Sequence, residues 1–542
     1  MTRNQRLVLD SLLLGVVGAL SAQIFMFFLN NSQSFFLGWL AGYRPPGLPE
    51  EGGVLLEFLG VHGRWLIPLS TTLGGLISGI IVFSLAPEAE GHGTDSAVKA
   101  YHRNEGYIRP RVPFVKMIAS AITIGSGGSA GREGPTALIS AGIGSIYASI
   151  FNRSETDRRT LLLIGMAAGL SAIFRSPIGC AILAVEVLYR GMEFESGVLF
   201  FTMLASIVAY VLNATLVGWR PLFEIPPILD VPGISAYFYY VLLGIAAGLV
   251  ATVLPSIFYT FRDWFKLIPV ADMFKPAIGG LLLGILALFL PQVLGGGYGW
   301  IQEAIDGKLS IYLLLALVFA KILSFSFTVS SGGSGGIFAP CLFVGAMLGG
   351  FMANLLGQPC GPFVVIGLVS VFGAAARVPF GTLFMVAEMT GGYQLLVPAL
   401  TALSVSLVIQ MTLTRRLTYK SLYEGQVRGR ADSPAHHAEH IKIAIGLLRN
   451  GQVPCSIAGE QLNLLDLLEQ GIEFDLGDGQ RLDIIQLSGE DPFVGDSFQS
   501  ICQLNKMGNK KNVAMIRKKE IYLPNADEVL EEGDKILSLV TV

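Results

Sequence analysis

The sequence predicts an all-α polytopic membrane protein followed by a small α/β domain, and three observations support this prediction. Of the 542 residues, 52% are hydrophobic and only 14% are charged, and the mean hydropathy is +0.60. Such values lie far outside the range of soluble globular domains. Apolar runs long enough to cross a hydrocarbon core of about 30 Å recur between residues 8 and 411. After Arg415 and Arg416 charged residues become frequent, which predicts a soluble C-terminal part.

The membrane part is expected to contain roughly ten to fourteen spans, several too short or too broken to cross alone. The clearest runs are Leu7 to Leu29, Trp65 to Leu85, Gly197 to Leu216, Tyr237 to Tyr259, Leu309 to Phe327 and Leu395 to Leu413. The first run follows Arg3 and Arg6 and lacks a small-residue cleavage site, so we interpret it as a retained helix. Positive charge there and between Arg415 and Arg430 places both termini in the cytoplasm, which requires an even number of crossings.

Two glycine-rich stretches, Gly125 to Pro135 and Ser330 to Pro340, read almost alike and interrupt apolar segments. A second repeat has nearly the same offset. In it Arg175, Pro177, Gly179 and Glu186 match Arg377, Pro379, Gly381 and Glu388 at a spacing of 202 residues. Two matches in the same order indicate internal duplication, and paired breaks of this kind predict a binding site near the membrane midplane. The sequence alone does not show whether the repeats are parallel or inverted.

The glycine-rich breaks have the features of helix starts that bind an anion. A helix that begins inside the membrane leaves its first N–H groups without intrahelical partners, and its dipole adds partial positive charge. Because water is scarce there, an anion is the natural partner. Glycine permits close approach of an ion, and Pro135 and Pro340 fit a first helical turn. Close helix packing through small residues is the alternative.

Glu133 stands in the first turn after the first break. A carboxylate is expensive in the hydrocarbon layer and is functional there by default. When ionised it competes with an anion for the helix start, and when protonated it leaves that position. Glu133 is therefore a candidate gate whose opening depends on pH. The alternative is that it only caps the helix or pairs with Arg132.

These residues resemble a known family. Gly131 to Pro135 together with Gly335 to Pro340 is similar to the signature motifs of the CLC chloride channels and proton/chloride exchangers. The resemblance covers about residues 8 to 427. It implies two inverted halves, a homodimer, and a separate anion pathway in each subunit. It also implies that Glu133 is the external gate.

The same resemblance implies a set of chloride ligands. Backbone amides are implied at Arg132, Glu133, Gly134, Ile337 and Phe338. A tyrosine on the final membrane helix is implied to contribute its hydroxyl. Tyr423 matches that tyrosine by position, and Tyr419 is a weaker candidate.

One departure from the family pattern concerns the first anion motif, which usually reads Gly-Ser-Gly-Ile-Pro. Here Gly91, His92 and Gly93 stand at the Gly-Ser-Gly positions, so an imidazole replaces the serine hydroxyl. We expect His92 to donate an N–H to the anion, to titrate near neutral pH, or to turn outward without a role. The preference between chloride and nitrate stays open.

A second departure concerns the proton route. Exchangers of the family commonly carry an acid just after the position that matches Glu186, but here that residue is Val187, which cannot relay a proton. The family's channels often have valine there, so the resemblance favours passive chloride conduction gated by Glu133. Proton-coupled chloride exchange is the alternative, because some exchangers lack this acid and Glu186 stands one residue earlier.

The C-terminal part divides into a linker at residues 428 to 440 and a cytoplasmic domain at 441 to 542. A helix is expected at Ile441 to Arg449. Strands are expected at Leu482 to Ile485, Val513 to Ile516 and Lys535 to Val540. From about residue 480 the pattern resembles an RCK-C (TrkA-C) domain. This implies regulation by a cytosolic ligand such as a cyclic dinucleotide or another nucleotide; a dimerisation module that binds nothing is the alternative.

Other classes of function have less support. A net charge of -3 argues against a nucleic-acid partner, and the five scattered cysteines form no C-x-x-C pair. The histidines at 436, 437 and 440 are better explained by a polar linker than by a metal site. We therefore expect chloride as the substrate, with no metal and no catalytic cofactor.

The six histidines and the membrane carboxylates do not form a recognisable set of nucleophile, base and orienting group, so we expect that the protein is not an enzyme. A regulatory subunit of a cation channel is suggested only by the C-terminal part, and no T-V-G-Y-G filter supports it. Taken together, the sequence predicts an integral protein of a plasma membrane, the inner membrane in a bacterium, with lipid and a second copy of the chain as partners.

Overall fold

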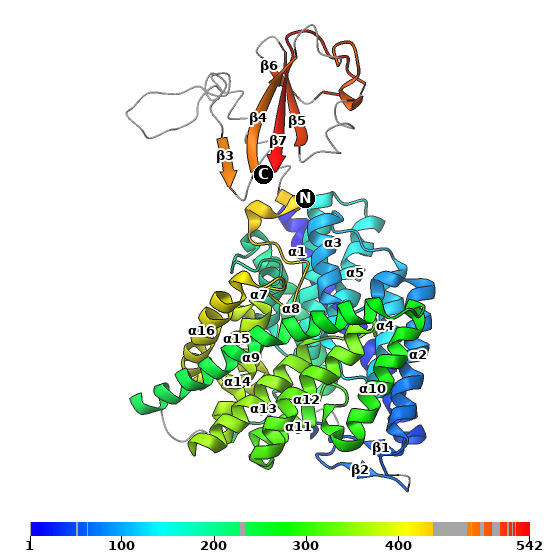
Figure 1. Ribbon diagram of the computed structural model, residues 1–542, viewed down its shortest axis with the longest axis vertical. Coiled ribbons are helices and arrows are strands. Elements are labelled where there is room, and N and C mark those ends of the chain that lie inside the picture. The colour runs from blue at the N-terminus through cyan, green and yellow to red at the C-terminus, as the bar shows by residue number, and fades with distance from the viewer. Residues whose placement is uncertain are drawn as a thin grey trace. The chain divides into compact units, whose positions relative to one another are not determined.

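The computed structural model divides the chain into two compact units, Met1–Gly429 and Arg430–Val542. In the first unit it describes residues 2–49, 53–61, 63–226 and 233–429. In the second unit it describes residues 430–436, 474–477, 480–487, 493–500, 510–517, 520–522, 524–525 and 527–541. The first unit is mainly helical, and the second contains a β-sheet (Figure 1).

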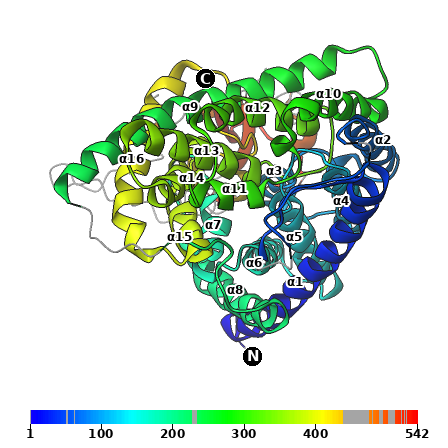
Figure 2. The same ribbon diagram turned by 90° about the horizontal axis from the view of Figure 1, so that it is seen from below.

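The helices of the first unit fall into two successive groups. The first group is α1 (Arg3–Gln33), α2 (Ile67–Leu85), α3 (Thr94–Arg103), α4 (Arg111–Gly125), α5 (Glu133–Ile150), α6 (Glu155–Phe174), α7 (Pro177–Glu186) and α8 (Ser196–Val217). The second is α9 (Ile234–Leu267), α10 (Lys275–Phe289), α11 (Tyr298–Ile305), α12 (Ile311–Ser330), α13 (Phe338–Leu356), α14 (Cys360–Ala376), α15 (Pro379–Thr390) and α16 (Leu396–Leu413). Figure 2 shows the first group, blue to cyan, beside the second, green to yellow.

Short helical turns join several of these helices. A π-helical turn, η1 (Ser34–Leu40), extends α1. The 3-10 turns are η3 (Pro87–Ala89), η4 (Asp272–Phe274), η5 (Pro291–Val293), η6 (Tyr393–Leu395), η7 (Thr414–Arg416) and η8 (Arg430–Asp432).

Within the described residues, eight helices are long and apolar enough to cross a membrane. They are Arg3–Leu40, Ile67–Leu85, Ser196–Val217, Ile234–Leu267, Asp272–Phe289, Ile311–Ser330, Phe338–Leu356 and Tyr393–Arg416. Each of the six apolar runs named from the sequence lies mostly inside one of these helices. The apolar helices α7 and α14 are shorter, as the interrupted sequence pattern suggested.

The internal duplication predicted from the sequence is visible in the backbone. Arg175 ends α6 and Arg377 ends α14, both in the left-handed region with φ of 54° and 56°. This conformation is unfavourable for a residue with a Cβ, so its recurrence at matched positions reflects a repeated local structure. Pro177 and Pro379 then begin α7 and α15, where proline fits the first helical position.

One part of the first unit departs from the all-α prediction. The strands β1 (Tyr43–Arg44) and β2 (Phe58–Leu59) pair in an antiparallel fashion between α1 and α2. The sequence Pro45-Pro46-Gly47 that follows β1 cannot continue a helix, because proline lacks the N–H and glycine favours turns. Within this unit the hairpin lies at the end opposite the N-terminus (Figure 1).

The second unit contains a five-stranded antiparallel sheet in the order β3-β4-β7-β5-β6. The strands are β3 (Phe474–Gly477), β4 (Gln480–Gln486), β5 (Lys510–Arg517), β6 (Glu520–Tyr522) and β7 (Lys535–Thr541). The three predicted strands lie in β4, β5 and β7 and are confirmed. The predicted helix at residues 441 to 449, and the histidines at 437 and 440, lie outside the described residues. The RCK-C resemblance stays a prediction.

Candidate anion-binding site

The two glycine-rich breaks meet in the interior of the first unit. Gly131 and Gly336 exchange two main-chain hydrogen bonds, each 2.7 Å from N to O. Two residues beyond each glycine a helix begins, α5 at Glu133 and α13 at Phe338. Two helix N-termini that are far apart in the sequence therefore converge on one bridge.

A third helix start joins this bridge. The N–H of Gly335 donates to the carbonyl of Gly91 (3.1 Å), and Gly93, with φ of +84°, precedes α3. A Cβ on Gly134 would lie only 2.1 Å from the carbonyl oxygen of His92. The starts of α3, α5 and α13 therefore face one small region, and their dipoles make it attractive to an anion.

Two buried lysines fix the neighbouring segments. Lys116 of α4 donates to two main-chain carbonyls just before α3, at 2.9 and 2.6 Å. Lys321 of α12 donates in the same way to two carbonyls before α11, at 2.8 and 2.7 Å. Neither lysine was singled out from the sequence, although each is an isolated cation in an apolar helix and the two lie at matched positions of the repeats.

The carboxylate of Glu133 lies against the bridge. Its side chain is fully buried, and a Cβ on Gly131 would lie 2.1 Å from Glu133 Oε2. The Arg132 Nε atom is 3.8 Å from Glu133 Oε1, and the guanidinium lies over the Tyr298 ring at 4.7 Å. The acid therefore occupies the region at which the helix starts point. In this position the Glu133 carboxylate also forms a long ion pair with Arg132.

His92 and Tyr423 lie side by side at this region. His92 is 8% exposed and does not turn outward; its ring centroid is 5.4 Å from that of Tyr423. The N–H of Asp95 donates to His92 Nδ1 (3.4 Å), so the neutral ring carries its proton on Nε2 and presents a donor. Tyr423 is 2% exposed, and its hydroxyl has no hydrogen bond of normal geometry to a described protein atom.

The position of Tyr423 differs from the expectation in one respect. Helix α16 ends at Leu413, and Tyr423 belongs to a non-helical segment that follows it rather than to the final helix. Helix α9 holds that segment in place, because the Tyr259 hydroxyl donates to the carbonyl of Leu422 (2.7 Å). The hydroxyl of Tyr419 instead donates to Asp263 (2.6 Å), which leaves Tyr423 as the tyrosine beside His92.

Ile337 and Phe338 form the start of α13. Ile337 is the residue before the helix, and Phe338 is 2% exposed. The Phe338 ring packs between Phe174, at 5.4 Å, and Phe372, at 4.0 Å between centroids. Both predicted ligand positions are therefore held rigidly beside the Gly131–Gly336 bridge, with their main chain in the first turn.

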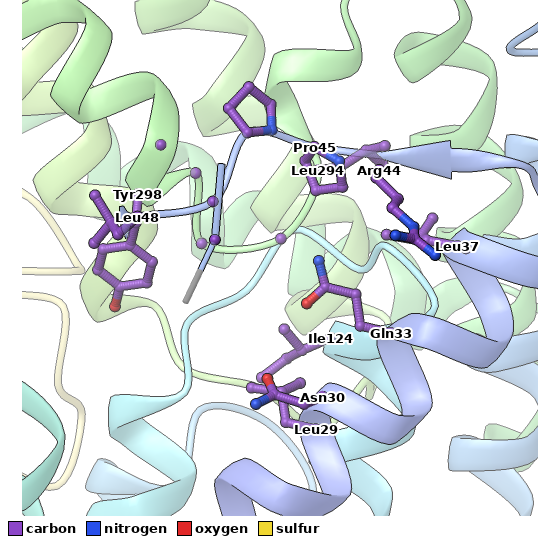
Figure 3. Close-up of a pocket in the computed structure, with 18 of the residues that line it drawn as sticks. Leu29, Asn30, Gln33, Leu37, Arg44, Pro45, Leu48, Ile124, Leu294 and Tyr298 are labelled. Atoms are coloured by element: carbon purple, nitrogen blue, oxygen red, sulfur yellow. The ribbon is translucent and has the colours of Figure 1, made fainter. Parts of the chain in front are cut away.

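A cavity of about 820 Å³ leads toward Arg132 from the end of the unit that carries the β1–β2 hairpin. Figure 3 shows Asn30 and Gln33 of α1 on one side of it and Tyr298 on the other. Arg44 also lines it, and no aspartate or glutamate appears among the described residues that do. The lining of this cavity, called the vestibule below, therefore presents hydrogen-bond donors together with the positive charges of Arg44 and Arg132.

The predicted proton-route position lies at the other side of the site. Val187 is fully buried, and its carbonyl accepts a hydrogen bond from Gln426 Nε2 (3.1 Å). The carboxylate of Glu186 accepts the N–H groups of Phe380 (3.1 Å) and Gly381 (2.6 Å) at the start of α15. Glu186 is therefore engaged as a helix cap.

Comparison with known proteins identifies the family of the chain. Residues 74–410 match the family model described as voltage gated chloride channel. The H(+)/Cl(-) exchange transporter ClcA of Salmonella agona (strain SL483) is 33% identical over 374 residues, which cover 64% of this chain and 77% of the relative. The protein of the same name from Salmonella dublin has the same identity and coverage.

Solved structures agree on the fold. A slow cyanobacterial Cl-/H+ antiporter matches with a TM-score of 0.66 at 21% identity, over 77% of this chain and 96% of that chain. A CLC-type fluoride/proton antiporter matches with a TM-score of 0.65 at 24% identity, over 79% and 99%. A eukaryotic CLC transporter matches with a TM-score of 0.61 at 19% identity, over 78% and 73%. With the family model and the sequence relatives, these matches show that the chain is an integral membrane protein of the voltage gated chloride channel (CLC) family.

Proposed function

We propose that this protein exchanges protons for chloride across a membrane and that Glu133 is the group shared by the two ions. Family membership supports chloride transport. One observation carries the proposal for Glu133: its buried carboxylate lies where three helix starts converge. When ionised, the carboxylate is the anion that fills this region. When protonated, it loses its attraction to the helix dipoles, and chloride replaces it.

Exchange has more support than the passive conduction favoured by the sequence. The relatives at 33% identity carry the name H(+)/Cl(-) exchange transporter. The argument for conduction rested on Val187, a single position. Exchange requires only that protonation of Glu133 and occupation by chloride be linked, and the overlap of carboxylate and anion region supplies that link.

Chloride is held in this proposal by groups from four segments. The main-chain N–H groups at the starts of α5 and α13 face the anion from two sides. Nε2 of His92 and the hydroxyl of Tyr423 supply two further donors. Hydrogen bonds to a charged partner are worth about 1.5–3 kcal/mol each, so these two side chains contribute measurably to chloride affinity.

We further propose a homodimer in a plasma membrane, the inner membrane in a bacterium, with both chain termini in the cytoplasm. Arginines at both ends of the membrane part support this orientation. On resemblance alone, we also propose that the C-terminal unit lets a cytosolic ligand, a cyclic dinucleotide or another nucleotide, regulate transport.

Proteoliposomes test the exchange. Purified full-length protein is reconstituted with chloride inside and an impermeant anion outside, and the external pH is recorded as chloride leaves. Exchange predicts proton uptake against the proton gradient, which stops when the chloride gradient is collapsed. Chloride efflux without proton movement would instead show passive conduction. The variant Glu133→Gln serves as the reference, because it cannot carry a proton and is expected to move chloride alone.

A further inference from the structure

Buried titratable side chains between the gate and a face of the membrane can relay protons. On the side away from the vestibule, Val187 cannot titrate and Glu186 caps α15. The question is therefore which buried acid receives protons on that side. The structure brings another acid, Glu195, close to the end of α7, although several loop residues separate it from Val187 in the sequence.

The face concerned is the one that carries the chain's N-terminus. Arg3 pairs with Asp157 (2.6 Å) at the start of α6. Arg159, in the same turn of α6, donates from Nε to the carbonyl of Tyr101 (3.1 Å) near the end of α3. The end of α3, and His102 with it, therefore lies close to the N-terminal face.

His102, Tyr189 and Glu195 form a buried cluster at this face, being 1%, 0% and 4% exposed. The Tyr189 hydroxyl donates to Glu195 Oε1. The rings of His102 and Tyr189 meet edge to face with centroids 5.6 Å apart. His102 Nε2 lies 3.0 Å from the carbonyl of Leu188, the residue after Val187.

Glu195 folds back onto the end of α7. Its main-chain N–H donates to the carbonyl of Val185 (3.5 Å), so the loop between α7 and α8 returns to the helix turn that contains Glu186. The neighbours Glu193 and Ser196 are exposed. Glu195 is therefore a buried acid directly beneath the surface and beside the position that Val187 leaves without an acid.

We propose that Glu195 is the group that takes up protons from the N-terminal face, with Tyr189 and His102 as positioning residues. In this step the carboxylate accepts a proton from the aqueous side and later releases it toward the interior. Helix α3 has ten residues, so about 15 Å separates this cluster from the anion region at its other end. The proposal rests on the proposed exchange function and assigns its entry step only.

Other charged groups lie on the neighbouring segments. Arg190 follows Tyr189 directly, and its N–H donates to the carbonyl of Val427 (2.9 Å), which brings Arg428 to the same edge. Glu193 is an exposed acid two residues before Glu195, and Glu186 is a buried acid at the end of α7. The alternative is a purely structural role, in which the Tyr189–Glu195 hydrogen bond only stabilises the loop between α7 and α8. The variant Glu195→Gln separates the two roles, because glutamine keeps an acceptor for Tyr189 and cannot take up a proton.

The test uses the full-length protein in proteoliposomes and records chloride efflux and proton uptake together for wild type, E195Q, E195D and E193Q. We expect E195Q to keep chloride efflux while proton uptake falls by about tenfold or more. E193Q, the exposed neighbour, should match wild type, and E195D, which keeps an acid, should retain most of the uptake. In the double variant E195Q/V187E an acid returns beside the same site, and proton uptake should recover.

Each contrary outcome has its own meaning. If wild type pumps protons and E195Q pumps equally well, the role of Glu195 is overturned while exchange stands. If E195Q loses chloride efflux and proton uptake in parallel, or E195D behaves like E195Q, the residue is structural. If wild type itself moves no protons, the exchange function and this inference fall together.

Discussion

Glu186 and Glu388 cap each other's helices. Glu186, the last residue of α7, accepts N–H groups at the start of α15, and Glu388, near the end of α15, accepts those of Ile178 and Gly179 at the start of α7. The end of each helix therefore lies beside the start of the other, so α7 and α15 are antiparallel. Both acids match in the sequence repeat, and this reciprocity is how an inverted pair of repeats satisfies two buried helix starts.

Removal of one cap should destabilise the fold. Glu388 is 9% exposed and also accepts a hydrogen bond from the Ser176 hydroxyl. Glu388→Ala leaves these donors without an acceptor and should cost about 2 kcal/mol or more of stability. We expect a lower melting temperature in detergent for E388A and a smaller decrease for E388Q, which keeps an acceptor oxygen. Equal melting temperatures for wild type and E388A would contradict the capping role.

The close approach of the three segments makes Gly134 intolerant of a side chain. In Gly134→Ala the new Cβ would lie 2.1 Å from the carbonyl oxygen of His92, which belongs to rigid main chain. We expect the helix starts to be pushed apart, with chloride binding measured by calorimetry weakened by about tenfold or more. Gly197→Ala is the matched control, because a Cβ there meets nothing within 4 Å. An unaltered affinity in G134A would refute this packing.

His92 and Tyr423 should each contribute to chloride affinity. Loss of a hydrogen bond to an anion costs about 1.5–3 kcal/mol, so His92→Ala and Tyr423→Phe should each weaken binding by about 10- to 150-fold. His92→Ser replaces one donor by another and should retain most of the affinity. Isothermal titration of the detergent-solubilised protein with chloride measures all three. If H92A binds as tightly as wild type, the ring does not face the anion.

The segment that carries Tyr423 should lose stability in acid. Arg262 donates to Glu424 (2.9 Å), and this hydrogen bond lowers the pKa of Glu424 below its ordinary value; Lys99 lies 3.6 Å away. A lowered folded-state pKa contributes stability that is present above the ordinary value and is lost as pH falls through the folded value. The melting temperature of wild type should therefore exceed that of Glu424→Gln at pH 7.

The same comparison at lower pH provides the check. As the pH falls below the ordinary pKa of a glutamate and through the lower folded-state pKa of Glu424, its carboxylate takes up a proton, and the difference between wild type and E424Q should shrink. Arg415→Gln, a change at an exposed charge in η7, should show no such convergence. A difference that persists unchanged into acid would show that the Arg262–Glu424 pair does not stabilise the segment.

Local patterns predicted the helix starts and the strands of the second unit. Glycine permits the positive φ and close approach that a break requires, and proline fits the first helical turn, so the starts of α5 and α13 could be predicted from the sequence. The duplication of Arg175 and Arg377 was equally visible, because repeated local sequence gives repeated local backbone.

Contacts between distant segments could not be predicted. Nothing in the sequence shows that Glu186 caps α15, that Lys116 binds carbonyls before α3, or that Glu195 folds back onto α7. These contacts depend on tertiary packing rather than on spacing. Tyr423 was expected on the final helix because the family resemblance implies a tyrosine there, whereas the structure holds it in a non-helical segment to which Tyr259 of α9 donates a hydrogen bond.

The central claim is that one buried acid, Glu133, links proton and chloride movement. The most direct measurement is the reversal potential of reconstituted protein under opposing chloride and proton gradients. The account predicts a value between the chloride and proton equilibrium potentials for wild type, and a value at the chloride equilibrium potential for Glu133→Gln. A wild-type reversal at the chloride potential, independent of the proton gradient, would contradict it.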